Sequence, residues 1–107
     1  MSLDVYLKKL MPTEIFNANV THNLNKMAKY VGLYEALWQP EEIGVIKAEQ
    51  LIPLLEKGLE KLKADPVGCR KLNPPNGWGD YEGLIQFVEN YLEACRENRD
   101  SDVDVSK

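Results

Sequence analysis

The strand-like end of the chain reads Ser101-Asp102-Val103-Asp104-Val105-Ser106. It alternates polar and apolar residues with a period of two, which is typical of a strand with one buried face. Val103 and Val105 would face inward and the acidic residues outward. A lone strand cannot satisfy its own backbone hydrogen-bonding groups, so this segment requires a partner strand.

The beginning of the chain predicts that partner. Partial alternation over 4–10 (DVYLKKL) indicates a strand with Val5 and Leu7 on one face. Pro12 then breaks the pattern, and 14–16 reads as a second extended piece. We therefore expect a small antiparallel sheet that joins the N- and C-terminal strands.

Amphipathic patterns predict helices between the two ends of the chain. Apolar residues recur at helical spacing in four segments, 24–31, 33–38, 48–64 and 81–95, and one further helical turn is expected at 67–72. Pro53 lies early in the third segment, so that helix either starts nearer residue 50 or bends at the proline. The pattern predicts a single α+β domain over 1–107, with three to four amphipathic helices packed on the sheet. The alternative is an all-α bundle with frayed ends.

Composition excludes several classes of partner. The chain has seventeen acidic and thirteen basic residues, a net charge of −4, and its lysines and arginines are scattered, which argues against nucleic acid. It has no apolar run long enough for a membrane span and no apolar leader, so we expect no membrane association and a cytoplasmic location. Cys69 and Cys95 show no metal-binding spacing, and we expect both to be reduced.

The only histidine, His22, lies in a run of short polar residues: Asn17, Asn19, Thr21, His22, Asn23 and Asn25. Thr21 is the expected N-cap of the first helix, which places His22 and Asn23 in its first turn. Backbone N–H groups there have no helical partner, and they attract anions. The alternative is that these side chains only cap and solvate a helix end.

A second candidate feature is the irregular stretch 73–79 (NPPNGWG), which precedes a helix capped by Asp80. Trp78 lies there between two glycines and offers a flat stacking surface for a base or a sugar ring. The alternative is that the indole is a plug that pins a long loop to the helices. Combining the two features predicts a pocket formed by Asn19, Thr21, His22, Asn23, Trp78 and Tyr81.

Enzyme signatures are absent from the sequence. It contains no nucleophile elbow, no phosphate-binding loop and no histidine-rich or cysteine-rich metal motif. We therefore expect no metal, no cofactor and no catalytic residue. Catalysis by His22 as a general base would need a partner such as Glu14 or Glu35.

Four strings resemble a family of small uncharacterised proteins encoded in phage and prophage genomes: NVTHNL (19–24), LWQPEE (37–42), NGWGDY (76–81) and FVENYLEAC (87–95). The resemblance runs from about residue 14 to residue 106. Pro75, where an acid is more usual, and Lys47, where a hydroxyl cap is more usual, depart from the pattern. The resemblance implies a protein made in the cytoplasm of an infected bacterium.

These observations predict a small phage-type binding protein, most simply a homo-oligomer. It would hold a small polar or nucleotide-like ligand and so counter host defence signalling. One alternative is a protein–protein interaction module that contacts a host protein through surface aromatic residues and an acidic face. A further alternative is a hydrolase or transferase that uses His22.

Overall fold

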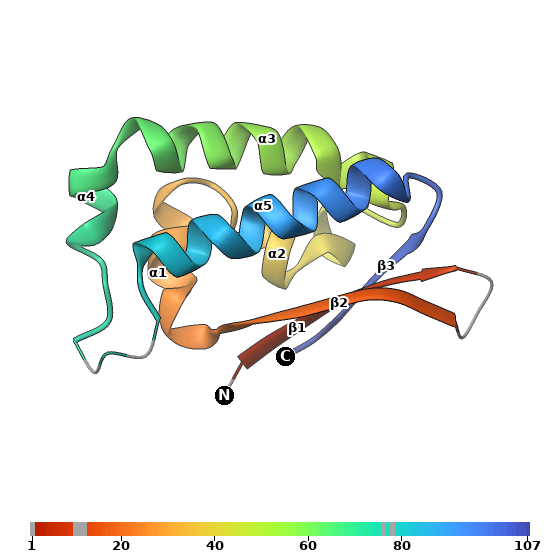
Figure 1. The fold of residues 1–107 in the computed structure, drawn as a ribbon, viewed down its shortest axis with the longest axis horizontal. Coiled ribbons are helices and arrows are strands. Elements are labelled where there is room, and N and C mark those ends of the chain that lie inside the picture. Colours follow the sequence, from red (N-terminus) through yellow and green to blue (C-terminus); the bar gives the residue numbers. More distant parts are fainter. Residues whose placement is uncertain (1, 10–12, 76, 78) are drawn as a thin grey trace.

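A three-stranded antiparallel sheet forms one layer of the molecule, and helices form the other (Figure 1). The computed structural model describes residues 2–9, 13–75, 77 and 79–107. The strands are β1 (Ser2–Lys9), β2 (Thr13–Thr21) and β3 (Asp102–Ser106), in the order β2-β1-β3. The predicted strand end at Leu10 and the predicted break at Pro12 lie outside the described residues.

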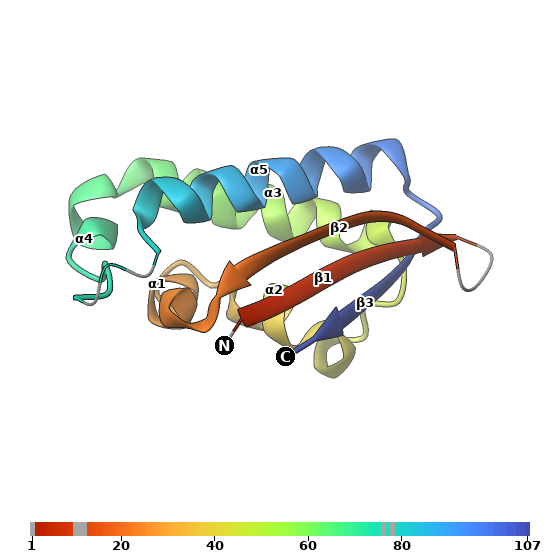
Figure 2. The same ribbon diagram turned by 60° about the horizontal axis from the view of Figure 1, so that its bottom comes forward.

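The pairing of β3 with β1 confirms the α+β prediction. Val5 lies opposite Val105 and Leu7 opposite Val103, so the two ends of the chain form neighbouring strands, as expected (Figure 2). The alternative of an all-α bundle is wrong, because β3 forms a regular ladder with β1 from Asp4 to Lys8.

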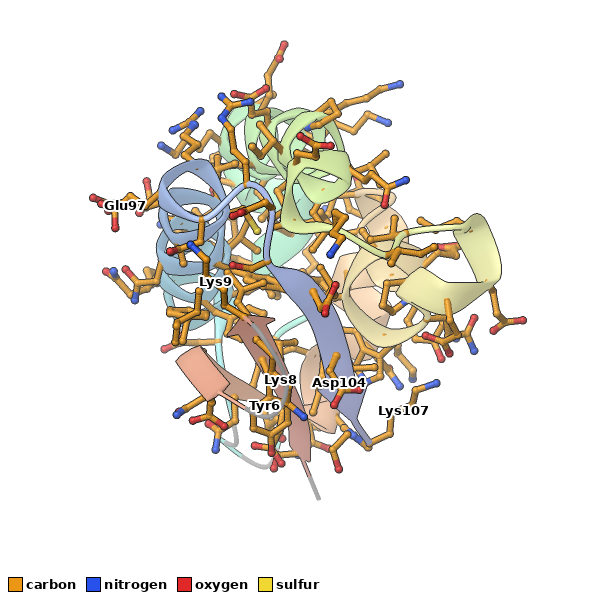
Figure 3. All side chains as sticks on the ribbon, turned by 90° about the vertical axis from the view of Figure 1, so that its right-hand side faces the viewer. Tyr6, Lys8, Lys9, Glu97, Asp104 and Lys107 are labelled. Atoms are coloured by element: carbon orange, nitrogen blue, oxygen red, sulfur yellow. The ribbon has the colours of Figure 1, made fainter. Side chains whose placement is uncertain are left out.

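The sheet has one buried face and one open face. Along β1, Leu3, Val5 and Leu7 are fully buried, and the residues between them are half-buried. On the open face, the Lys8 ammonium lies 2.8 Å from an Asp104 carboxylate oxygen and 5.3 Å from the centre of the Tyr6 ring (Figure 3). Antiparallel sheets commonly have one face packed on the core and one face in solvent, and the solvent-exposed face carries polar side chains.

Two long helices, α3 (Ala48–Ala64) and α5 (Tyr81–Glu97), cover the buried face (Figure 2). They run antiparallel, since the ion pair of Arg96 with Glu56 and that of Lys63 with Glu89 join them in opposite order. Their apolar stripes enter one continuous core. The bounds of α3 match the prediction, so Pro53 lies inside the helix and the start nearer residue 50 is wrong.

Short elements connect the sheet to the long helices. They are the 3-10 turns η1 (His22–Leu24) and η2 (Pro40–Ile43) and the helices α1 (Asn25–Tyr30), α2 (Tyr34–Trp38) and α4 (Pro66–Arg70). Gly32 ends the segment after α1 with a φ of 76°, a conformation that glycine adopts without strain. The first predicted helix is thus a 3-10 turn followed by less than two turns of α-helix.

β2 differs most from its prediction. It extends to Thr21, so Asn17 and Asn19 lie in a strand and not in a loop before a helix. The physical reason is its pairing with β1, which satisfies the backbone groups on one side of this whole stretch. Phe16 stacks on Tyr91 of α5 with ring centres 5.9 Å apart, which fixes the inward face of the strand.

Candidate functional site

The end of β2 leads directly into the turn that carries His22. Thr21 is the N-cap of η1, as expected: its hydroxyl accepts hydrogen bonds from the backbone N–H of Asn23 at 3.3 Å and from the Asn23 side-chain amide at 3.1 Å. Asn23 is therefore fixed in place by Thr21, and its amide oxygen is left to accept a further hydrogen bond.

His22 is half-buried and packs its ring edge-on against Trp38, with ring centres 6.1 Å apart. Its Nε2 atom is buried and has no hydrogen-bond partner among the residues that the structure describes. The side chain therefore has a packing role in addition to any contact with a ligand, which residue types alone do not reveal.

A hollow of about 510 Å³ opens beside this turn. Two segments line it, one from the first turns after β2 and one from the chain after α4: His22, Asn23, Asn25, Lys26, Lys71, Leu72, Asn73, Pro74 and Pro75. Its size is within the range of pockets that hold small molecules. The structure thus brings together two segments that lie more than forty residues apart, and both contain stretches that the sequence singled out.

The charge of this hollow differs from that of the protein as a whole. Two lysines, Lys26 and Lys71, line it, whereas no aspartate or glutamate does. Neither lysine forms an ion pair within the described part of the chain. Because the chain carries a net charge of −4, a hollow lined by two lysines and by no carboxylate is a local positive site on an acidic protein.

The structure changes the argument for anion binding that the sequence suggests. A free helix N-terminus was expected at His22 and Asn23, but η1 has three residues and α1 has six. Few peptide dipoles are aligned there, and the N–H of Asn23 is already bonded to Thr21. The lysines, and not the helix end, are the groups that can attract an anion.

Three predicted site residues, Asn19, Thr21 and Tyr81, do not line the hollow, and Thr21 only caps the turn beside it. Asn19 is in β2 opposite Asp4, on the open face of the sheet, and does not line the hollow. Tyr81 is buried, and its hydroxyl donates to the carbonyl oxygen of Leu62 at 2.6 Å. Burial raises the pKa of the Tyr81 hydroxyl.

Tyr81 nevertheless supports the hollow indirectly. Its backbone N–H donates to the side-chain oxygen of Asn73 at 2.8 Å, and Asn73 is a lining residue. The first residue of α5 thus fixes one end of the loop that forms the wall. This is a structural role in place of the ligand contact that the sequence predicted.

Trp78 lies outside the described residues, so both readings of this indole stay predictions. The neighbouring Gly79 has a φ of 93°, and a Cβ atom there would lie 2.6 Å from the Thr21 methyl group and 3.1 Å from Leu24. The loop therefore returns to α5 across the turn that carries His22. That close approach explains why a glycine occupies this position.

Sequence reasoning did not select Lys71 and Asn73 as site residues. Lys71 has no local signal, and Asn73 was marked only as the start of the irregular stretch 73–79. Both reach His22 only through the packing of the chain after α4. Lys26 was recognisable, since helical spacing places it on the same side as His22. The turn that carries His22 is therefore recognisable from local sequence, whereas the second wall of the site, from the chain after α4, is a product of the tertiary fold.

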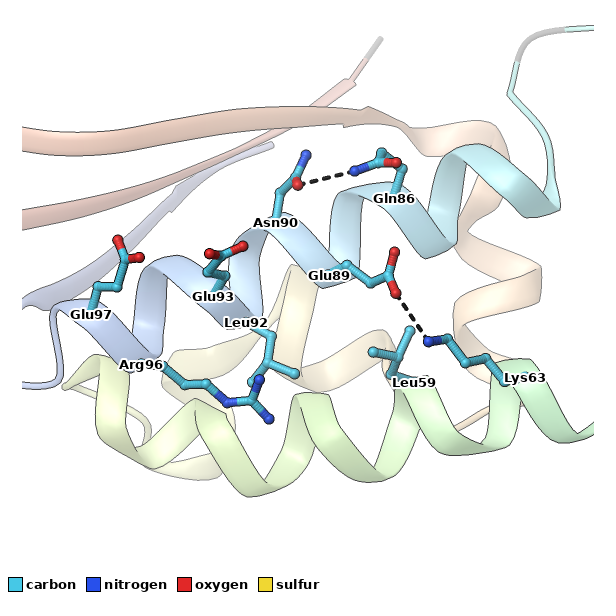
Figure 4. A pocket seen from close by; sticks show the side chains of 9 residues that line it. All are labelled: Leu59, Lys63, Gln86, Glu89, Asn90, Leu92, Glu93, Arg96 and Glu97. Atoms are coloured by element: carbon cyan, nitrogen blue, oxygen red, sulfur yellow. Dashed lines mark hydrogen bonds and ion pairs between the residues drawn. The ribbon is translucent and has the colours of Figure 1, made fainter.

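A larger hollow of about 690 Å³ lies between α3 and α5 (Figure 4). Its cations are already matched by carboxylates: Lys63 lies 3.0 Å from Glu89, and Arg96 lies 2.6 Å from Glu56. A charged ligand would have to displace these pairs. We therefore assign the candidate site to the hollow beside His22.

Other reactive side chains are confined to the core. Cys69 and Cys95 are buried free thiols, and burial raises the pKa of both, that of Cys95 to about 12. Among the described residues, no three His, Cys, Asp or Glu side chains are grouped as they would be around a metal ion. Glu14, a suggested partner for His22, instead accepts a hydrogen bond from Asn17.

Comparison with known proteins finds no matching family profile, no similar curated protein and no similar solved structure. No helix in the described part of the chain is long and apolar enough to cross a membrane. The case for a function therefore depends on the geometry and charge of the candidate site.

Proposed function

We propose that the protein binds a small anionic, nucleotide-like ligand in the hollow beside His22. The observation that carries this proposal is the charge of the lining: Lys26 and Lys71 face a common space without any acidic neighbour in the lining. Charge-assisted hydrogen bonds from lysines to phosphate or carboxylate oxygens are stronger than neutral ones.

The remaining lining residues suit the rest of such a ligand. Side-chain amides of Asn23, Asn25 and Asn73 can donate to and accept from hydroxyl groups or base edges. Pro74 and Pro75 add apolar surface against which a sugar or a base can pack. Trp78, three residues further on, is proposed to stack on the base.

The proposed biological role follows from the resemblance to phage-encoded proteins. A small protein made in an infected bacterium would sequester a nucleotide signal of the host defence without chemical conversion. This role requires affinity for the ligand and enough copies of the protein, and it does not require a catalytic residue.

Isothermal titration against a panel of mononucleotides, cyclic nucleotides and cyclic dinucleotides tests the proposal. The test variant is Lys26→Gln/Lys71→Gln, and the matched control is Lys57→Gln/Lys61→Gln, which removes two exposed lysines of α3. We expect Kd to rise about tenfold or more in the test variant at low ionic strength, because two charge-assisted contacts are lost. We expect the control to bind within about twofold of the unchanged protein, since screening weakens distant charges.

Two results would contradict the proposal. One is the absence of heat with every member of the panel. The other is an equal loss of affinity in both double variants, which would mean that net charge, and not this hollow, determines binding.

A further inference from the structure

The outer edge of β2 is open to another strand. Because β2 pairs only with β1, one side of its backbone has no strand partner within the described residues. Unpaired N–H and C=O groups on an edge strand form a template for an additional strand. This site is separate from the hollow beside His22, and its argument does not depend on the proposed ligand.

The opposite edge of the sheet is protected, which makes the open edge of β2 distinctive. At that edge, the N–H of Val103 donates to the carbonyl oxygen of Ile46 at 2.9 Å, and Lys47 forms an isolated bridge with Asp102. The connector before α3 thus covers the first two residues of β3. β3 also has five residues and carries two aspartates, and both features disfavour strand addition.

The side chains of β2 do little to discourage a partner. A bulge at Ile15, opposite the step from Leu7 to Lys8, interrupts the ladder, and on one side of it the six residues of 16–21 run without proline or charge. Native edge strands commonly carry charges or prolines that block pairing. Six residues span roughly 20 Å, enough for a short added strand.

A hollow of about 310 Å³ runs between this strand and α5. Phe16, Asn17 and Ala18 line one side, and Asn90, Glu93, Ala94 and Glu97 line the other. Figure 4 shows Asn90, Glu93 and Glu97 on the side of α5 that faces the sheet, whereas Arg96 and Glu89 point toward α3. Glu93 and Glu97 are exposed and form no ion pair within the described part of the chain.

We propose that β2 accepts an extended basic segment of another protein as a fourth strand. Backbone hydrogen bonds to 16–21 would hold the segment, as in other cases of strand addition. Its lysine or arginine side chains on the helix side would lie against Glu93 and Glu97. The chemistry that selects the partner is thus an alternating basic sequence with a β-forming backbone.

Charge also argues against a second copy of the chain at this edge. Symmetric pairing of β2 with its counterpart would place the two α5 helices on the same face, along one seam. Glu93 and Glu97 of both copies would then face that seam. Like charges at such a seam oppose association, whereas a basic segment would neutralise them.

Titration with a peptide of alternating lysine and valine tests the proposal, with amide hydrogen exchange measured by NMR. A peptide of alternating lysine and proline carries the same charge and cannot complete a strand ladder. We expect the lysine–valine peptide to slow exchange at alternate amides of 16–21, and we expect the proline peptide to leave them unchanged.

Charge variants complete the test. We expect Glu93→Gln/Glu97→Gln to raise the Kd of the lysine–valine peptide about fivefold, because two surface ion pairs are lost. The matched control Glu42→Gln/Glu60→Gln removes two exposed carboxylates elsewhere and should change Kd less than about twofold. Equal binding of both peptides, protection confined to residues outside β2, or an edge already protected in a dimer of the free protein would each overturn the proposal.

Discussion

Replacement of Gly58 by alanine tests the packing of α3 most sharply. Gly58 lies in the middle of α3, on its buried side, where the fully buried Leu33 side chain crosses the helix. A Cβ atom built on Gly58 would lie 2.9 Å from Leu33 Cδ1 and closer still to Leu33 Cγ and Cδ2. Real Cβ atoms do not approach other carbon atoms so closely, so either Leu33 or the helix must move.

The expected magnitude is a balance of two effects. Alanine favours a helix interior over glycine by about 1 kcal/mol. Extra volume in a packed core typically costs about 1–3 kcal/mol, and the complete burial of Leu33 places this site at or above the upper end. We therefore expect Gly58→Ala to lower the free energy of unfolding by about 2 kcal/mol or more, measured by urea denaturation.

A double-mutant cycle with Leu33→Ala supplies the control. Leu33→Ala alone should cost about 2–5 kcal/mol, because it leaves a cavity against α3. In that background the methyl group of Gly58→Ala enters free space, so its effect should become neutral or stabilising by up to about 1 kcal/mol. Stabilisation by Gly58→Ala in the unchanged protein would refute the close approach of Leu33 to the helix.

Three further predictions concern single groups. Tyr91→Phe should be neutral or stabilise the fold by up to about 1 kcal/mol in denaturant titrations. The reason is that the buried Tyr91 hydroxyl has no hydrogen-bond partner among the described residues. A loss of stability larger than about 1 kcal/mol would reveal a hidden hydrogen bond. The Tyr30 hydroxyl and a backbone N–H lower the pKa of Asp65, so Asp65 stabilises the fold above its unfolded pKa of about 3.9 and loses that contribution as the pH falls. Thermal unfolding between about pH 5 and pH 2 should therefore decline less steeply in Asp65→Asn than in the unchanged protein, and parallel curves would contradict the assignment. Because burial raises the pKa of Cys69 and Cys95, both should react with a disulfide reagent far more slowly in the native protein than in denaturant, and fast native labelling would show that the core opens.

Much of the fold was predictable because its signals are local or periodic. The alternation at Val103 and Val105 indicates a strand, and a strand requires a partner, which identifies β1 without any knowledge of the tertiary structure. The bounds of α3 follow from its apolar stripe and from Asp65 and Pro66 at its end.

The bounds of β2 could have been predicted from the same kind of pattern. Phe16, Ala18 and Val20 alternate with Asn17 and Asn19, which indicates a strand with one apolar face. We instead expected the asparagine run to lie at the start of the first helix, and Asn is depleted in strands. Pairing with β1 overrides that intrinsic preference.

The candidate site was predictable only in its local half. His22 and Asn23 belong to one turn, so their proximity follows from the sequence. Lys71 and Asn73 join them through the packing of α4 and α5, which no local pattern encodes. The prediction of Tyr81 as a ligand contact was wrong, because an aromatic residue at the start of a helix is equally compatible with a ligand contact and with a place in the core.

Chemical-shift mapping with a cyclic dinucleotide and with a mononucleotide tests the central claim most directly. If the hollow beside His22 holds an anionic ligand, the backbone amides that shift on titration will concentrate in 22–26 and 71–73. The shifts should vanish in Lys26→Gln/Lys71→Gln and persist in Lys57→Gln/Lys61→Gln. Shifts confined to other parts of the surface, or none at saturating concentrations of either nucleotide, would contradict the account.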